Sequence, residues 1–88
     1  MPSVTIGLPA ALTSPRPPHD YDCDARTVGE ALRQLGERAP QYASRLFYGE
    51  RLLVVVSVNG RHVPPGRVQD MELSDGDRID VLPPVAGG

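Results

Sequence analysis

Apolar side chains occupy every second position of residues 3–8, and this alternation predicts a β-strand with one buried face. Pro9 ends the strand. The following stretch, 10–19, contains three further prolines and predicts a loop. Residues 20–24 alternate more weakly and predict a second strand, with Tyr21 and Cys23 on one face.

A helix is predicted next. Thr27, followed three residues later by Glu30, fits a capping box, in which the Thr hydroxyl accepts an N–H of the first turn and the Glu reaches back. Apolar residues then recur at helical spacing, and the helix is expected to end before Pro40. The apolar positions are Val28, Ala31, Leu32 and Leu35. A short second helix is expected over 41–47, ended by Gly49.

The second half of the chain predicts three more strands. Residues 52–58 are β-branched and apolar on both faces, as in a central strand covered by the helix. Asn59-Gly60 is a strong hairpin signal, and residues 61–63 are expected to return as a short strand. Residues 74–77 predict a turn. A last strand over 78–82 has Ile79 and Val81 inward.

The element order is therefore strand, strand, helix, strand, strand, strand. This order predicts an α+β fold, a ubiquitin-like β-grasp with a mixed sheet of about five strands and one main helix packed on one face. Pro83-Pro84 cannot continue the sheet ladder. We therefore expect a β-grasp domain over 1–82 and an extended, flexible C-terminal tail over 83–88.

Composition restricts the possible functions. The chain has 88 residues, enough for one small domain, and its net charge is −2. All nine basic residues are arginines spread singly along the chain, which argues against nucleic acid as a partner. The longest apolar run, 52–56, is too short to cross a membrane, and the first residues do not resemble a secretory signal, so we expect a cytoplasmic protein.

Few side chains are candidates for chemistry. The chain lacks lysine, so it offers no side-chain amine as an isopeptide acceptor, and its one cysteine, Cys23, is expected to be a small buried residue. The two histidines, His19 and His62, lack partners at metal-ligand spacing and are expected at the surface. Five acidic residues gather near the C-terminus: Asp70, Glu72, Asp75, Asp77 and Asp80. We expect their carboxylates to be solvated. The alternative is that they form an acidic surface that steers a basic partner protein toward the chain. Gly29 and Gly36 are isolated helix positions rather than a phosphate-binding loop.

The end of the chain carries the strongest candidate. It reads Pro83-Pro84-Val85-Ala86-Gly87-Gly88 and follows a strand directly, so its base is held by the sheet. The two prolines favour an extended form. Gly88 lacks a Cβ, which leaves its carboxyl carbon open to attack, and Gly87 lets the backbone pass through a narrow channel. Since no other segment suits ATP or Mg²⁺, a partner enzyme would have to activate this carboxylate.

At these residues the sequence resembles the ubiquitin-like sulfur carriers of the MoaD/ThiS family. The resemblance rests on Thr27 to Leu32, on Val56-Ser57-Val58-Asn59-Gly60 and, most specifically, on the last sixteen residues, 73–88. The tail looks most like the MoaD branch, the small subunit of molybdopterin synthase. The stretch 13–20 departs from the family because it is unusually rich in proline.

The resemblance implies a carrier rather than an enzyme, with no bound cofactor. An ATP-dependent, E1-like adenylating enzyme would join Gly88 to AMP, and a persulfide sulfur source would then leave a thiocarboxylate on Gly88. Pro83, Pro84, Val85, Ala86 and Gly87 would bind partners, and a second partner, a sulfur-accepting synthase subunit or biosynthetic enzyme, would take the sulfur. By analogy, docking would use the exposed apolar face of the sheet near the tail.

The acceptor in the MoaD branch is a pterin precursor of the molybdenum cofactor. Sulfur transfer in thiamin, cysteine or natural-product biosynthesis is the first alternative. A ubiquitin-like protein modifier, in which lysines of other proteins attack the same activated Gly88, is the second. A passive β-grasp interaction module, whose tail has no chemical role, is the third.

Overall fold

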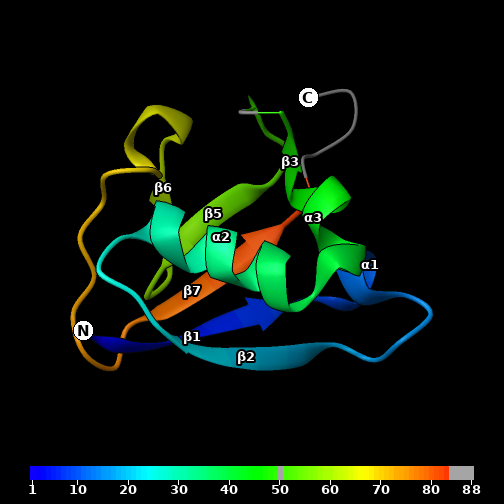
Figure 1. Cartoon of the computed structure of the whole chain (residues 1–88), viewed down its shortest axis with the longest axis horizontal. Helices are drawn as coiled ribbons and strands as arrows, with labels where there is room; N and C mark the ends of the chain where they lie inside the picture. Colours follow the sequence, from blue (N-terminus) through cyan, green and yellow to red (C-terminus); the bar gives the residue numbers. More distant parts are fainter. Residues whose placement is uncertain (50, 84–88) are drawn as a thin grey trace.

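Five strands form one mixed sheet in the computed structural model, which describes residues 1–49 and 51–83 (Figure 1). The strand order across the sheet is β2-β1-β7-β5-β6. Their bounds are Ser3–Leu8 for β1, His19–Asp24 for β2, Val55–Val58 for β5, Arg61–Val63 for β6 and Arg78–Leu82 for β7. The central strand, β7, runs parallel to β1 and antiparallel to β5. The expected strands at 3–8, 20–24, 61–63 and 78–82 are confirmed, with β2 one residue longer than predicted.

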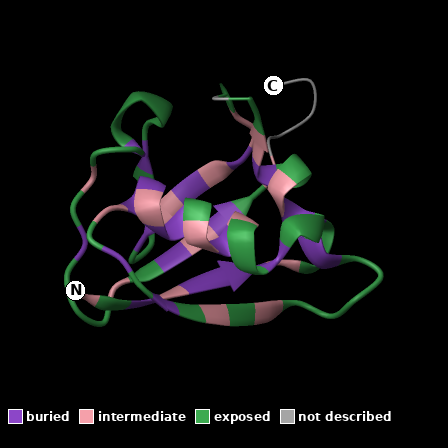
Figure 2. Ribbon diagram, viewed as in Figure 1, coloured by how far each residue is buried: buried purple, intermediate pink, exposed green. Residues whose placement is uncertain are grey.

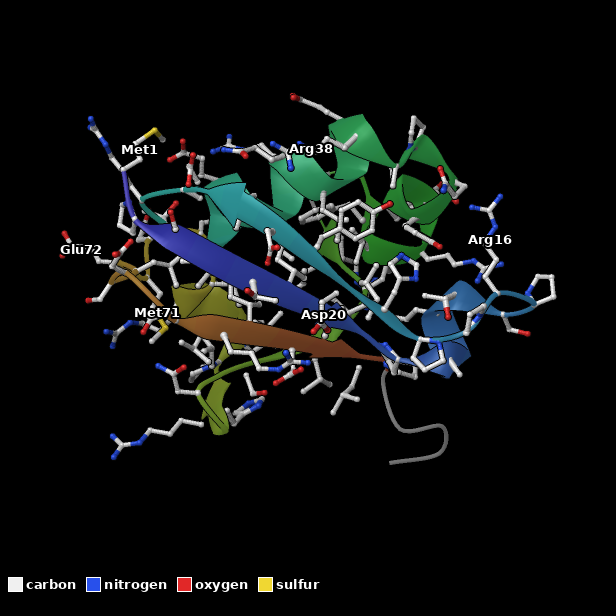
Figure 3. The ribbon with its side chains drawn as sticks, turned by 90° about the horizontal axis from the view of Figure 1, so that it is seen from below. Met1, Arg16, Asp20, Arg38, Met71 and Glu72 are labelled. Carbon is white, nitrogen blue, oxygen red and sulfur yellow. The ribbon has the colours of Figure 1, made fainter. Side chains whose placement is uncertain are left out.

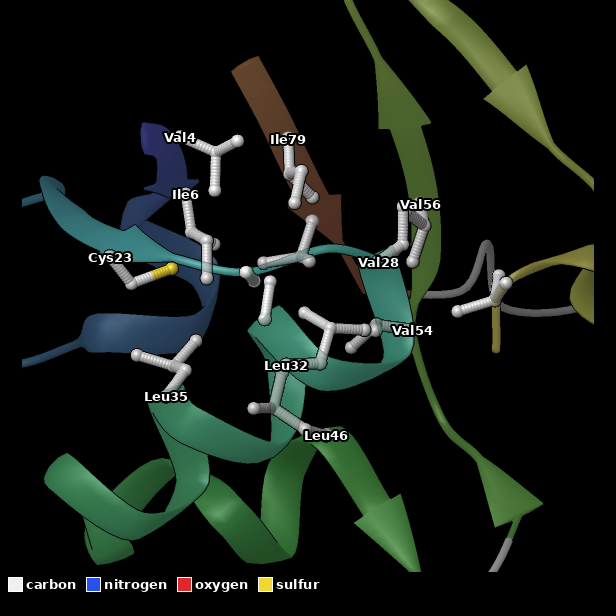
Figure 4. Close-up of a cluster of buried hydrophobic side chains, with 14 of the residues drawn as sticks. Val4, Ile6, Cys23, Val28, Leu32, Leu35, Leu46, Val54, Val56 and Ile79 are labelled. Carbon is white, nitrogen blue, oxygen red and sulfur yellow. The ribbon is translucent and has the colours of Figure 1, made fainter. Parts of the chain in front are cut away.

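One helix, α2 (Val28–Arg38), lies across a single face of this sheet (Figure 1). Its apolar positions are buried against the inward side chains of the strands, and the charged positions Arg33, Glu37 and Arg38 are exposed. The core between the two layers is continuous (Figure 4). Its largest fully buried side chains include Ile6, Val28, Leu32, Leu35, Val56, Ile79 and Val81.

The start of α2 forms as the capping box predicts, with one difference. Thr27 is in an extended conformation, and its hydroxyl accepts the backbone N–H of Glu30 at 3.2 Å. The carboxylate of Glu30 reaches back one residue further than expected, to the backbone N–H of Arg26 at 3.3 Å. The Glu30 carboxylate therefore accepts the backbone N–H of the residue before the cap, and not the backbone N–H of Thr27 itself.

The prediction of a loop over 10–19 is wrong at both ends. Residues Ala10–Thr13 form a short helix, α1, whose first turn closes when the N–H groups of Leu12 and Thr13 donate to the carbonyl of Pro9. The prolines that suggested a loop come only after this turn, and Ala and Leu favour helix. His19, in turn, is the first residue of β2 and pairs with Leu8.

The segment from 40 to 58 also differs from the prediction. The second helix, α3, is Pro40–Leu46, with Pro40 in its first turn, where the missing N–H costs nothing. The predicted strand 52–58 is two strands. Arg51–Leu52 (β4) pairs with Phe47–Tyr48 (β3) in a separate small hairpin, and only β5 joins the main sheet. Gly49, with φ at +62°, belongs to the turn of that hairpin and does not end a helix.

Two predicted turns are confirmed. Asn59 and Gly60 both adopt positive φ, at 52° and 83°, and join β5 to β6. In the turn 74–77, Gly76 has a φ of +86° and Ser74 accepts the backbone N–H of Asp77. A short 3-10 helix, η1 (Pro65–Arg67), follows β6. The mixed sheet with α2 across one face is the ubiquitin-like β-grasp that the element order predicts.

Candidate functional site

The last strand of the sheet ends at the base of the predicted tail. In β7, Ile79 and Val81 are fully buried and fix the strand in the centre of the sheet. The strand ends at Leu82, and Pro83 follows it, half-buried. The predicted tail therefore follows directly on the central strand of the sheet. Of the predicted partner-binding residues, only Pro83 is described, and the remainder of the tail with Gly88 lies outside the described residues.

The face of the sheet opposite α2 carries a polar network on β7 and β2 (Figure 3). The guanidinium of Arg78 binds both carboxylate oxygens of Asp20 in a two-pronged contact, with each N–O distance 3.1 Å. Its Nε donates to Asp80 at 3.1 Å. These three residues come from β2 and β7, which β1 separates. The network therefore spans the sheet just before the tail.

Gly7 makes this network possible. It lies on β1 opposite both Asp20 and Asp80. A Cβ at this position would stand 2.4 Å from the Arg78 guanidinium and 2.4 Å from the Asp80 carboxylate. The absence of a side chain thus lets the arginine lie flat against the strand between its two acidic partners.

The same contacts shift the acid–base equilibria on this face. The hydrogen bond from Arg78 lowers the pKa of Asp20 below its usual value, and Asp20 in turn raises the pKa of Arg78. In the neighbouring turn, the backbone N–H of Ser74 and the side-chain amide of Asn59 lower the pKa of Asp77. All three groups are held in their charged forms at neutral pH.

The acidic residues near the C-terminus are solvent-accessible, as predicted, and besides Asp80 in the network two of them have structural roles. Asp77 accepts the Ser74 N–H at 2.7 Å and the Asn59 amide at 2.9 Å, and so closes the turn before β7. Asp75 accepts the N–H of Ser3 and links that turn to β1. Within residues 1–49 and 51–83, no group of three or more His, Cys, Asp or Glu side chains is placed to hold a metal ion.

A shallow groove of about 600 Å³ runs over Gly7 toward the end of β7. The Arg78–Asp20–Asp80 network forms its polar part, and the apolar part includes Leu8, Pro9, Pro18 and Leu82. The expectation of an apolar sheet face is therefore wrong for most of the surface. Figure 2 shows exposed and intermediate residues along most of β2, the edge strand next to β1. Asp, Ser and Thr residues occupy the outward positions of β1 and β2, and Leu82, 48% exposed, is the large apolar side chain that this face offers near Pro83.

The histidines and the cysteine are accounted for by packing and exposure. His62 is exposed, as predicted. His19 is half-buried, and its ring centroid lies 5.2 Å from that of Tyr21 and 5.9 Å from that of Tyr42. Cys23 is buried, as predicted, and burial raises the pKa of its thiol. A raised pKa disfavours the reactive thiolate, so Cys23 has the properties of a core residue.

Sequence reasoning missed the network formed by Gly7, Asp20 and Arg78. Gly7 stands at an outward position of β1, where Ser3 and Thr5 carry side chains, and this missing side chain is the signal that was available. The assignment of its partners needs the strand register, which places β2 and β7 on either side of β1.

A family model described as the ThiS family matches residues 17–88. A curated relative, small archaeal modifier protein 3 from Haloferax volcanii, is 40% identical over 67 residues, which cover 74% of this chain and 73% of that protein.

Two solved structures are also similar to this chain. A chain in the crystal structure of the BexX/CysO complex from Amycolatopsis orientalis matches with a TM-score of 0.74 and 29% identity, covering 97% of this chain and 99% of that one. A putative molybdopterin converting factor, subunit 1, from Pyrococcus furiosus matches with a TM-score of 0.64 and 26% identity, covering 97% and 100%. These proteins share both the fold and nearly the full length of this chain.

Proposed function

Because this chain belongs to the ThiS family of small ubiquitin-like carrier and modifier proteins, we propose that it is a sulfur carrier whose reactive group is the carboxylate of Gly88. The supporting observation is the end of β7, where the central strand ends at Leu82 and leads directly into Pro83 and the diglycine sequence. Six residues, 83–88, separate the folded sheet from the Gly88 carboxylate, which is long enough for the carboxylate to enter the active site of another protein.

The first chemical step activates Gly88. A carboxylate oxygen attacks the α-phosphorus of ATP in the active site of an E1-like adenylating enzyme. The bond between the α-phosphorus and the bridging oxygen breaks, pyrophosphate leaves, and Gly88 becomes an acyl-adenylate. Because Gly88 has no Cβ, the acyl carbon of this adenylate is open to attack in the step that follows. The carrier supplies no catalytic group, and ATP and the sulfur donor are used by its partner.

The second step introduces sulfur. A sulfur nucleophile attacks the acyl carbon of Gly88, a carbon–sulfur bond forms, the bond to AMP breaks and AMP leaves. With hydrosulfide as the donor, the products are the thiocarboxylate and AMP. A persulfide donor gives an acyl disulfide, and a thiol must then cleave its S–S bond. A second partner finally accepts the sulfur.

We place the accepting pathway in molybdopterin synthesis, on the likeness of the tail to the MoaD branch. The similarity to a putative molybdopterin converting factor subunit supports this assignment. Sulfur transfer in thiamin, cysteine or natural-product biosynthesis is the alternative. The match to a chain of the BexX/CysO complex supports the broader statement that the carrier works in complex with another protein.

A protein modifier is the second candidate function, favoured by the 40% identity to a protein named as a small archaeal modifier. It shares the activation of Gly88 and differs in the attacking group, which is a lysine amine of another protein. Since this chain has no lysine, it cannot extend a chain of copies through its own side chains. Immunoblots of cells would separate the two: higher-mass conjugates indicate a modifier, and a single free band indicates a carrier.

Intact-mass measurement tests the carrier directly. The protein is incubated with a cognate activating enzyme, ATP and sulfide, and its mass is expected to increase by the difference between sulfur and oxygen. A variant that lacks Gly88 is the control and should not gain this mass. An unchanged wild-type mass, under conditions that modify a known carrier, would contradict the proposal. Full partner function after deletion of Gly87 and Gly88 would instead favour a passive interaction module.

A further inference from the structure

The strand β2 forms one edge of the main sheet. It pairs with β1 on one side, and its other side is turned away from the sheet (Figure 1). The outward backbone N–H and C=O groups of an edge strand are a template for pairing with a strand of another chain. What occupies these groups therefore decides whether the protein can associate through this edge.

The strand register shows which backbone groups of β2 point outward. On β1, the N–H of Thr5 donates to the carbonyl of Asp77, so Thr5 turns its backbone groups toward β7. Its register partner on β2, Asp22, therefore belongs to a pair that exchanges no backbone hydrogen bonds, and the backbone groups of Asp22 point outward. Those of Asp20 and Asp24, two residues away on either side, do the same. We call the outward groups of these three residues the β2 edge.

Two side chains of α2 occupy acceptors of the β2 edge. The Nη1 of Arg38 donates to the carbonyl of Asp22 at 2.8 Å, and the Nε2 of Gln34 donates to the carbonyl of Asp24 at 2.7 Å (Figure 3). The two donors are four residues apart and so lie on the same side of the helix. A strand added at this edge needs both carbonyls for its own N–H groups and would have to displace both side chains.

The opposite edge of the sheet, β6, is protected in another way. It has three residues, and because Val58 and Arg61 flank the two-residue turn as a hydrogen-bonded pair, His62 is its residue with outward backbone groups. Pro64 takes the next outward position and has no N–H to offer. Short length and a proline make β6 a poor template for pairing. In contrast, β2 has six residues and no proline, so its protection depends on α2.

The strand that fits the β2 edge is β2 of a second copy of this chain. Antiparallel pairing about a two-fold axis at Asp22 places Asp22 opposite Asp22 and Asp20 opposite Asp24. Each of these pairs would then exchange backbone hydrogen bonds between outward N–H and C=O groups. The same register places carboxylates opposite one another, which opposes pairing until salt screens them.

We propose that Gln34 and Arg38 keep the β2 edge closed, and that without them two copies pair through antiparallel β2 strands into one continuous sheet. The contact is autoinhibitory toward self-association, and it is independent of the Gly88 chemistry.

Sedimentation equilibrium of the double variant Gln34→Ala/Arg38→Ala is the test. Alanine is the best helix former, so α2 should be kept, and thermal unfolding checks this. In about 0.5 M chloride the carboxylates are screened. The variant should then dimerise at a protein concentration at least about thirtyfold lower than the wild type, because four side-chain hydrogen bonds per dimer no longer have to be broken.

The matched control is Arg33→Ala/Glu37→Ala. It removes two exposed side chains from the same helix, neither of which donates to β2 in the part of the chain that the structure describes. This control should sediment as the wild type does.

Amide hydrogen exchange locates the contact. In the dimer of the double variant, the amides of Asp20, Asp22 and Asp24 should exchange at least about tenfold more slowly than in the monomeric control. The proposal is overturned if the double variant sediments as the control does, or if it dimerises while these three amides exchange at the control's rate.

Discussion

At the scale of single residues, two glycines of α2 have opposite structural roles. A Cβ at Gly29 would stand 2.9 Å from the backbone of Gln69, which cannot move without displacing the segment after η1. A Cβ at Gly36 would meet the Cβ of Ala43 at 3.5 Å, an ordinary contact. Gly29 therefore sets how closely α2 approaches its neighbour, whereas Gly36 is simply a poor helix former.

Substitution of these glycines by alanine should consequently change stability in opposite directions. Gly36→Ala should stabilise the protein by about 0.5–1 kcal/mol, the gain in helix propensity. Gly29→Ala should destabilise it by about 1–2 kcal/mol, because overpacking exceeds that same gain. Urea unfolding of the two variants measures both values, and equal effects would show that the Gly29 contact does not limit the packing.

The lowered pKa of Asp77 predicts how the stability of the protein depends on pH. Its pKa is lowered in the folded protein, so its contribution to stability is present above the pKa of the unfolded state, about 3.9, and is lost as pH falls through the lower folded value. Asp77→Asn should therefore reduce the loss of stability between neutral pH and about pH 3.

Urea unfolding at both pH values gives the comparison. Asp70→Asn is the matched control, since Asp70 is exposed and makes none of the hydrogen bonds found among the described residues. An identical pH dependence for wild type and Asp77→Asn would contradict the role assigned to the turn.

At the scale of elements, the sequence predicts correctly the helices, strands and turns whose local sequence pattern agrees with the way they pack in the fold. The helix α2 is found where the capping box and the apolar period place it, and the Asn59-Gly60 turn forms as its residues require. The errors lie where local composition is ambiguous. Residues 52–56 are all apolar, so no alternation shows that the chain changes its strand partner at Leu53, whose N–H donates to the carbonyl of Leu46.

The proline-rich stretch is a second segment whose local composition misled the prediction of its secondary structure. Three prolines after residue 14 obscured a turn of helix that ends at Thr13. The polar network shows a stronger limit, because Asp20 and Arg78 lie 58 positions apart and meet only through the register of three strands. Of the candidate site, the sequence could predict the strand end and the tail composition, while the face beside them depended on tertiary structure.

The cap of α2 offers a direct test at this scale. Thr27→Ala removes the acceptor for the Glu30 N–H and should destabilise the protein by about 1 kcal/mol. Thr27→Ser keeps the hydroxyl and should retain most of that stability. Thermal unfolding of both variants is sufficient, and equal losses would show that the methyl group rather than the hydrogen bond stabilises this end of the helix.

At the scale of the whole molecule, the described residues form one folded body whose central strand ends at Leu82, just before the tail that we propose to be reactive. Helix and sheet bury a single core, and the last strand to contribute to it, β7, is the central strand of the sheet. Within the described residues, no helix is long and apolar enough to cross a membrane. Leu82 is nearly half exposed beside Pro83, and we propose that the partner enzyme contacts this apolar side chain.

Leu82→Asp should therefore impair activation without unfolding the protein. We expect kcat/KM for adenylation by the partner enzyme to fall about tenfold, equivalent to roughly 1.4 kcal/mol of lost apolar contact, with Tm little changed. Gly66→Asp adds the same charge on η1, where nothing lies within 4 Å of a new Cβ, and should leave activation unchanged. Equal rates for the two variants would remove Leu82 from the docking surface.

The position of the sulfur atom tests the central claim most directly. The protein is isolated after reaction with its activating enzyme, ATP and sulfide, digested, and its peptides are sequenced by fragmentation mass spectrometry. Our account predicts that sulfur replaces one oxygen at Gly88, and that a Cys23→Ala variant acquires it equally. Sulfur found on Cys23, or a C-terminal peptide that never gains mass, would contradict it.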